Sequence, residues 1–178
     1  MPVTSLGFIH IGIVVLAGFR FHLSAINVQC SMHIPGIEII YAPPTAVEFV
    51  ALRAAAGMKE RTVVSAEKGI PNSLFWITLR SGGKLIGMGR VVGDGGTVVQ
   101  ITDIAVDPEE RGKGYGSYIF DQIREFILAE IPDDAFVCLF AEREVAPFYQ
   151  AKGFEFSQEK WPGMYWPCLD RVKIKTQE

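Results

Sequence analysis

The chain has 178 residues, the length of one globular domain of ordinary size. Hydrophobic residues make up 49% of it and charged residues 21%, a balance that excludes an intrinsically disordered chain. The formal net charge of −3 provides no basic field for a nucleic-acid backbone, so we expect no nucleic-acid partner.

The cysteines and histidines limit the chemistry further. The cysteines are odd in number and have no CxxC spacing, which argues against a disulfide framework and a zinc site and favours a reducing compartment. All histidines precede Glu38, so neither a histidine-based nucleophile nor a histidine-ligated metal is expected in the rest of the chain. We expect no metal, and chemistry based on carboxylates, tyrosines and backbone amides. The residues concerned are Cys30, Cys138, Cys168, His10, His22 and His33.

Residues 1–35 differ from the rest in composition and are interpreted as a hydrophobic leader. They contain one charged side chain, Arg20, and an apolar run at residues 6–19 that is shorter than the roughly 20 residues of a membrane span. No Lys or Arg provides the basic start of a signal peptide. We expect an extra packed segment, or a stretch from a misplaced start codon or unspliced intron, in a cytoplasmic protein without a membrane partner. A secreted or anchored form is the alternative.

One domain is expected at residues 36–170, followed by a tail at residues 171–178. Thr45-Ala-Val-Glu48 is a capping box that opens its first helix, whose predicted apolar face is Val47, Val50, Ala51 and Ala54. The apolar run at residues 135–140 is typical of a strand covered on both faces. In chain order we expect strands at residues 37–41, 74–79, 84–92, 97–106, 135–140 and 154–166, and helices at residues 45–57, 61–68, 116–130 and 145–152.

The order β-α-α-β-β-β-α-β-α-β describes a meander that feeds one βαβ unit. The predicted fold class is therefore α/β with a mixed sheet, and not a doubly wound sheet. The helix at residues 116–130 should turn one apolar face to this sheet, formed by Ile119, Phe120, Ile123, Phe126 and Ile127.

A glycine-rich turn, Arg111-Gly112-Lys113-Gly114-Tyr115-Gly116-Ser117, joins the strand at residues 97–106 to this helix. The glycines remove side chains, so successive N–H groups can point into one concavity, and the helix N-terminus adds free amides and a positive dipole end. Arg111 and Lys113 add positive charge, so the turn predicts a site for a phosphate or pyrophosphate.

Other phosphate-binding motifs fit this turn less well. A P-loop needs GxxxxGK[ST], whereas Lys113 precedes Gly114 here. A dinucleotide fingerprint needs GxGxxG within repeated βαβ units, whereas the spacing here is GxGxG and one such unit is expected. The remaining alternative is a glycine-rich helix entry that binds no ligand.

Two motifs in register resemble the GNAT N-acetyltransferase superfamily. Ile104-Ala-Val-Asp107-Pro108 followed by Arg111-Gly-Lys-Gly114-Tyr-Gly116 is similar to its acetyl-CoA motif, [RQ]-x-x-G-x-[GA], after a strand that ends in an apolar-Ala-Val-x-Pro run. Pro147-Phe-Tyr149-Gln-Ala-Lys-Gly153-Phe154 is similar to its second motif. The element order also matches, so the resemblance covers about residues 37–166. It implies acetyl-CoA as co-substrate, and two central parallel strands that splay apart.

The resemblance also implies roles for individual residues. The strand before the turn would pair with the pantetheine arm, the turn would hold the pyrophosphate, and Tyr149 would protonate the leaving thiolate. The implied cofactor-binding residues are Ile104, Ala105, Val106, Arg111, Gly112, Lys113, Gly114, Tyr115, Gly116 and Ser117.

The acceptor amine must lose a proton, because an alkylammonium with a pKa of about 10.4 is not neutral at pH 7. Asp103 is the acidic residue of an otherwise apolar strand, and burial would raise its pKa, so we predict that it is the base. Alternatively Asp103 only shapes the strand and Glu142 or water takes the proton. Gln100 occupies a position at which many family members carry Glu. For Tyr149 the alternative role is core packing.

We therefore expect an N-acetyltransferase that acts on a small-molecule amine as a monomer or homodimer, because no separate recognition domain is expected. The alternatives are a protein or peptide acceptor, and a CoA-binding module without catalysis. The acceptor pocket is expected in the loops at residues 58–72 and 161–166.

Overall fold

The computed structural model describes residues 34–157, which form one sheet with helices on both faces. The element order matches the predicted one as far as the helix at residues 145–152. In chain order the elements are β1 (Ile37–Ile40), α1 (Ala46–Ala55), α2 (Val63–Gly69), η1 (Ile70–Asn72), β2 (Phe75–Ser81), β3 (Lys84–Gly93), β4 (Val98–Val106), η2 (Pro108–Glu110), α3 (Tyr115–Glu130), β5 (Phe136–Leu139) and α4 (Ala146–Gln150).

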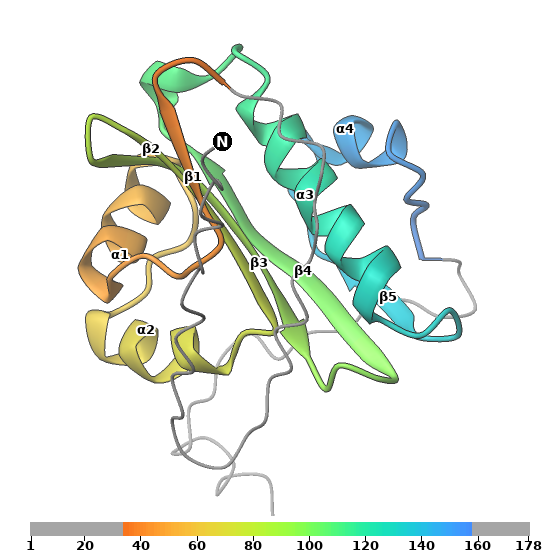
Figure 1. The fold of residues 1–178 in the computed structure, drawn as a ribbon. Coiled ribbons are helices and arrows are strands. Elements are labelled where there is room, and N and C mark those ends of the chain that lie inside the picture. The colour runs from red at the N-terminus through yellow and green to blue at the C-terminus, as the bar shows by residue number, and fades with distance from the viewer. Residues whose placement is uncertain (1–33, 158–178) are drawn as a thin grey trace, which may run out of the picture. The chain divides into compact units, whose positions relative to one another are not determined.

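The strands lie in the order β1-β2-β3-β4-β5. The first four are antiparallel neighbours, and β5 returns after α3 to lie parallel to β4. Figure 1 shows α1 and α2 on one side of the sheet, and α3 and α4 on the other. The predicted mixed sheet, a meander that feeds one βαβ unit, is confirmed.

Each face of the sheet carries its own hydrophobic core. The core under α3 includes Ile77, Leu79, Ile86, Val91, Val99, Ile101, Ile119, Phe120 and Ile123. The core under α1 and α2 is formed by Phe49, Leu52, Ala66, Ile70, Trp76, Leu85, Met88 and Ala105. Each large apolar side chain buried in this way contributes about 1.5–3 kcal/mol of transfer free energy. The predicted apolar face of α3 is confirmed, since its first three members are buried and the last two pack against them.

The first helix starts as predicted but turns a different face to the sheet. The Thr45 hydroxyl accepts from the Glu48 N–H at 3.2 Å, and the Glu48 carboxylate accepts from the Thr45 N–H at 2.9 Å, so the capping box is confirmed. The predicted apolar face is wrong, because Val47 is 64% exposed while Phe49 and Arg53 are buried. A phenylalanine buries more apolar surface than a valine, and Arg53 finds an ionic partner on the sheet.

β4 contains a β-bulge. Two of its residues, Asp103 and Ile104, lie opposite a single residue of β3, Gly89. Asp103 has a φ of +56°, in the left-handed region, which costs a residue with a side chain about 1 kcal/mol or more. The bulge is therefore held by other interactions of Asp103.

The bulge moves side chains from one face of the sheet to the other. Before it, Val99 and Ile101 lie in the core under α3; after it, Ala105 lies in the core under α1 and α2. Strict alternation would place the Asp103 carboxylate among the apolar side chains under α3. The extra residue directs it instead to the face on which Arg53 lies.

The segment after α3 differs from its prediction. Phe136 in β5 and Phe140 just after it are 66% and 71% exposed, so a strand covered on both faces is wrong here. The side chains alternate, and Val137 and Leu139 pack against the core under α3. Residues 154–157 contain no strand, and the rest of the predicted strand at 154–166 lies outside the described residues, as does almost all of the predicted leader. Among residues 34–157, no helix combines the length and hydrophobicity needed to cross a bilayer.

We predict that Gly89→Ala lowers the free energy of unfolding by about 1–3 kcal/mol, because the site opposite the bulge has no room for a methyl group. A Cβ at position 89 would lie 2.6 Å from Cγ2 of Ile119 and 2.9 Å from Cδ1 of Ile123. Urea denaturation measures the change. Gly87→Ala is the matched control with a smaller expected loss, since its nearest atom is the end of the Ile119 side chain at 3.0 Å. Equal losses in the two variants would contradict this account of the packing.

Candidate active site

The glycine-rich turn has the backbone geometry of an anion site. Gly112 and Gly114 have φ values of +78° and +84°, which residues with a Cβ rarely adopt, and Gly114 is the N-cap of the 16-residue helix α3. Within the described chain, no N–H from residue 112 to residue 117 donates to a backbone or side-chain acceptor, and the first helical bond runs from the Tyr118 N–H to the Gly114 carbonyl at 3.0 Å. Six consecutive amides at the positive end of a helix are therefore available to an anion.

The two basic side chains of the turn have weak partners. Arg111 donates to the carbonyl oxygen of Ala56 at 2.9 Å, which ties the turn to the end of α1. Lys113 pairs with Glu110 at 2.7 Å. Exposed pairs of this kind contribute about 1 kcal/mol or less, so Lys113 can exchange Glu110 for a bound phosphate at little cost.

Lys152 is a further cation near the start of α3, and the sequence analysis missed it. Its ammonium group donates to Ser117 at 2.8 Å and to Asp121 at 2.6 Å, and it lies over the rings of Phe120 and Phe148. In the sequence it was identified only as the last residue of the predicted helix at residues 145–152. Lys152 links the turn that follows α4 to the first turn of α3, where the free amides lie.

β4 and β5 diverge beside the turn. Their parallel pairing runs from Val98 with Phe136 to Ile101 with Leu139 and then stops. Residues 102–106 of β4 continue without a described strand on that side. The predicted splay is confirmed, and this free edge offers backbone N–H and C=O groups to an extended ligand.

Tyr149 lies on α4 within a cluster of aromatic rings. Its ring centroid is 5.0 Å from that of Phe148, 6.1 Å from Phe120 and 6.3 Å from Phe154. Burial raises the pKa of the phenol above its usual value of 10, so the hydroxyl keeps its proton at neutral pH. The hydroxyl has no hydrogen-bond partner among residues 34–157. The ring of Tyr149 is thus held by packing, while its hydroxyl group remains available as a hydrogen-bond and proton donor.

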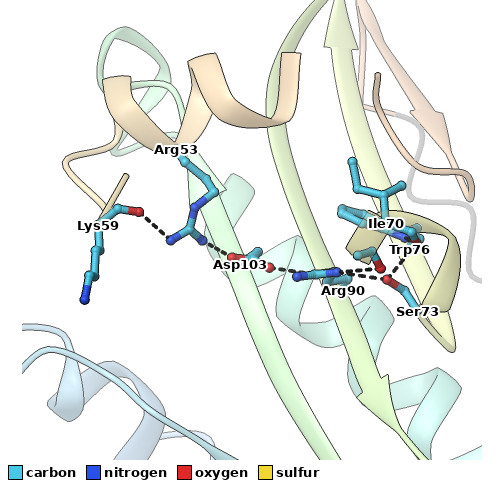
Figure 2. Close-up of polar contacts among 8 residues, drawn as sticks. Arg53, Lys59, Ile70, Ser73, Trp76, Arg90 and Asp103 are labelled. Carbon is cyan, nitrogen blue, oxygen red and sulfur yellow. Dashed lines mark hydrogen bonds and ion pairs between the residues drawn. The ribbon is translucent and has the colours of Figure 1, made fainter. Parts of the chain in front are cut away.

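Asp103 lies between two arginines (Figure 2). One carboxylate oxygen accepts from Nη1 of Arg53, and the other accepts from Nε of Arg90 at 2.6 Å. The side chain is 5% exposed, and a proton on it would leave two guanidinium groups without their counter-charge. This arrangement does not favour the predicted role of general base. It supports the alternative, in which Asp103 shapes the strand.

The two arginines were not identified from the sequence. Arg53 also donates to the carbonyl oxygen of Lys59 at 2.8 Å, and Arg90 to the Ser73 hydroxyl at 3.1 Å. Burial, followed by repulsion from Arg61 and Arg90, lowers the pKa of Arg53 to about 10, so it stays cationic at neutral pH. Nε of Arg53 is buried without an acceptor in the described part of the chain. Positive charge in this cluster is therefore only partly compensated.

Glu142 is the other residue predicted as a possible general base. Glu142 is exposed in the segment before α4, where its backbone carbonyl accepts from the N–H groups of Val145 and Ala146 at 3.1 Å. Its carboxylate has no ion-pair partner within residues 34–157. No group of three or more His, Cys, Asp or Glu that could hold a metal ion occurs in that range.

Comparison with known proteins decides the family. The family model of the acetyltransferase (GNAT) domain matches residues 71–156. A solved structure from meticillin-resistant Staphylococcus aureus, described as a probable acetyltransferase, is 42% identical with a TM-score of 0.70, over 74% of this chain and 99% of that chain. The chain belongs to the GNAT acetyltransferase family. Acetyl-CoA is the co-substrate of that family, and the predicted fold class and family are confirmed.

Curated GNAT relatives match over a shorter stretch. A chloroplastic GCN5-related N-acetyltransferase of Arabidopsis thaliana is 39% identical over 83 residues, which cover 47% of this chain and 31% of that protein. A histone acetyltransferase of Glycine max is 35% identical over 83 residues, which cover 47% of this chain and 35% of that protein. The match thus spans about a third of the length of these curated relatives.

We predict that Asp103→Asn lowers the free energy of unfolding by about 3–5 kcal/mol, because it leaves two buried guanidinium groups without a carboxylate. Asp121→Asn is the control: its partner is Lys152 and its side chain is 48% exposed, so a loss of about 1 kcal/mol or less is expected. Urea denaturation measures both. A stable Asp103→Asn protein whose lost turnover returns at high pH, where the amine is already neutral, would instead identify Asp103 as the base.

Proposed function

We propose that this chain transfers an acetyl group from acetyl-CoA to the primary amine of a small molecule. One observation carries the proposal: the edge of β4 that no described strand covers leads directly into a turn whose six consecutive N–H groups have no acceptor among residues 34–157. An extended arm with amide groups that ends in a pyrophosphate fits this succession of strand edge and anion site. A nucleotide without such an arm would use the turn alone.

The charges near the turn also fit a pyrophosphate. Of the three carboxylates that precede the turn, Asp107 pairs with Lys84 at 2.8 Å and Glu110 with Lys113 at 2.7 Å, and Glu109 lies 4.0 Å from Lys84. The ammonium group of Lys84 lowers the pKa of Asp107, as expected for a formed ion pair. The negative charge of Asp107 is therefore already balanced when an anion binds in the turn.

When bound, acetyl-CoA would supply the thioester acetyl group that the amine attacks. Residues 102–106 would orient its arm, and the backbone of residues 111–117 would hold its pyrophosphate. Tyr149 would donate the phenolic proton to the departing sulfur, and its raised pKa keeps that proton in place at neutral pH. Packing of the Tyr149 ring against Phe120 and Phe148 fixes the position from which it donates.

The acceptor amine must lose a proton before or during attack. Both oxygens of Asp103 are bound by guanidinium groups, whereas the Glu142 carboxylate is exposed and has no described ion-pair partner. Glu142 or solvent is therefore the better supported proton acceptor.

A protein acceptor and a plastid location are the alternatives that the relatives raise. One relative is named a histone acetyltransferase, although this chain matches only 35% of it, and another is named chloroplastic. The available Tyr149 hydroxyl argues against a third alternative, a CoA-binding module without catalysis. A screen of amines, amino acids and peptides, read out as release of free CoA, tests which acceptor class applies, and fusion of residues 1–35 to a reporter tests the cytoplasmic location that we propose.

We predict that the chain binds acetyl-CoA at micromolar concentration or tighter, and ATP and NAD at least about tenfold more weakly, because neither has a pantetheine arm. Gly116→Glu should abolish binding, since its carboxylate would compete for the free amides. The melting temperature should hold, because the nearest atom to a Cβ at position 116 is 4.0 Å away and an acidic residue in the first turn favours a helix. Calorimetry measures the affinities, and Gly116→Ala separates size from charge. A preference for ATP or NAD would end the acetyl-CoA proposal.

We predict that Tyr149→Phe lowers turnover at least about tenfold, because the ring stays and the proton donor is lost. Affinity for acetyl-CoA should not change, and CoA release with a saturating amine measures the rate. Tyr41→Phe is the control: its hydroxyl donates to Gln122 at 2.6 Å and has no proposed part in the reaction. Unchanged turnover in Tyr149→Phe would show that the thiolate leaves without help from this residue.

A further inference from the structure

A cleft opens on the face of the sheet that α1 and α2 cover. It has a volume of about 140 Å³ and lies between α1, α2 and β3. Phe49, Ala66 and Ile70 contribute apolar surface to it, and the two arginines that line it are Arg61 and Arg90. Most of its lining comes from residues 58–72, the segment in which the acceptor pocket was predicted, and this segment forms α2 and η1 rather than a loop.

The charge in and behind this cleft is strongly unbalanced. Arg53 and Arg90 share the carboxylate of Asp103, and Arg61 lies close enough to act on the charge of both. Among residues 34–157 these three guanidinium groups have one carboxylate as ion-pair partner, in a chain of net charge −3. After burial, the charge of Arg61 is the next cause that lowers the pKa of both Arg53 and Arg90. The three groups therefore repel one another, and an anion in the cleft would relieve that repulsion.

Both lining arginines have donors to spare. Arg61 is exposed, makes no ion pair with any residue from 34 to 157, and donates only to the adjacent carbonyl of Glu60 at 3.0 Å. Arg90 uses Nε for Asp103 and Nη1 for Gly69 and Ser73, so its Nη2 has no acceptor in the described chain, and this atom is not buried. Guanidinium groups bind carboxylates and phosphates through two parallel donors.

The cleft lies next to the point where the sheet opens. Arg90 pairs in register with Thr102, and Thr102 follows directly after Ile101, the last residue of β4 that pairs with β5. A molecule held by Arg90 is therefore close to the free edge of β4, where the acetyl group would be presented.

We propose that this cleft binds the acceptor and that Arg61 and Arg90 hold an anionic group on it, a carboxylate or a phosphate, while its amine faces the edge of β4. The proposal rests on the acetyltransferase function proposed above and adds the acceptor class. Apolar surface from Phe49 and Ile70 would contact the short chain between the two groups.

The positive charge of these arginines has two consequences for the acceptor amine. Nearby positive charge disfavours an ammonium group, so it lowers the pKa of a bound acceptor and favours the neutral form that attacks. It also disfavours acceptors with several positive charges, so polyamines and lysine-rich peptides should be poor substrates.

Matched pairs of amines test the proposal. β-Alanine should have a KM at least about tenfold below that of β-alaninamide, and phosphoethanolamine at least about tenfold below that of ethanolamine, because each pair differs only in the anionic group. The first pair reports on a carboxylate and the second on a phosphate. Preference for the neutral member of both pairs, or for spermidine or a lysine-rich peptide, would overturn the proposal.

Variants separate this proposal from the acetyl-CoA proposal. Arg61→Gln should raise the KM of the preferred anionic acceptor and leave the affinity for acetyl-CoA unchanged, and Arg61→Lys should restore part of the loss. Arg124→Gln, which removes an exposed arginine of α3, is the control and should change neither constant. Failure of the wild-type protein to bind acetyl-CoA would contradict the proposed function. Normal binding of acetyl-CoA without a preference for anionic acceptors would contradict only the proposal about the acceptor.

A chemical measurement completes the test without turnover. Phenylglyoxal modifies accessible arginines, so mass spectrometry should show that Arg61 reacts and that β-alanine or phosphoethanolamine protects it. β-Alaninamide and ethanolamine should not protect it. Equal modification of Arg61 with all four probes would overturn the proposal, even if no member of the panel is acetylated.

Discussion

The carboxylate of Asp103, held between Arg53 and Arg90, is the interaction on which the rest of the structure depends. The two ion pairs hold a non-glycine residue at a positive φ, and this residue is the bulge of β4. The bulge reverses the faces of the strand, and pairing with β5 ends at its N-terminal side. One buried carboxylate thus links α1, the bulge and the open edge.

Much of the fold could be predicted because its signals are local. The capping box at Thr45 specifies one helix end, glycines mark the turns, and the spacing of apolar residues separates helices from strands. The family motifs are also local, since each lies on one strand-turn-helix segment or one helix. The prediction of the apolar face of α1 was wrong because Arg53 faces the sheet. From sequence alone, an arginine is assigned to the solvent-exposed face unless its ion-pair partner is known.

The site was less predictable because its central contacts are long-range. Asp103 is 50 positions from Arg53 and 13 from Arg90, and neither separation leaves a pattern in the sequence. The bulge is also invisible to alternation, since Val99, Ile101, Asp103 and Ala105 read as one face of a regular strand but lie on two. An acidic residue in an apolar strand indicated that Asp103 was special. Its ion pairs, which bear on whether it can accept a proton, required the structure.

The two faces of the sheet differ in how far the family pattern reaches. The GNAT model matches from residue 71 onward, so α1, α2 and Arg61 precede it, while the turn and the free edge lie within it. The elements that would bind the donor thus lie within the match to the family model, and the elements that would choose the acceptor precede it. Exchange of α1 and α2, by evolution or by engineering, would therefore alter the selectivity for the acceptor while the elements that bind acetyl-CoA stay the same. Any such graft must keep an arginine at position 53, because its loss would leave the buried carboxylate of Asp103 without one of its two ion-pair partners.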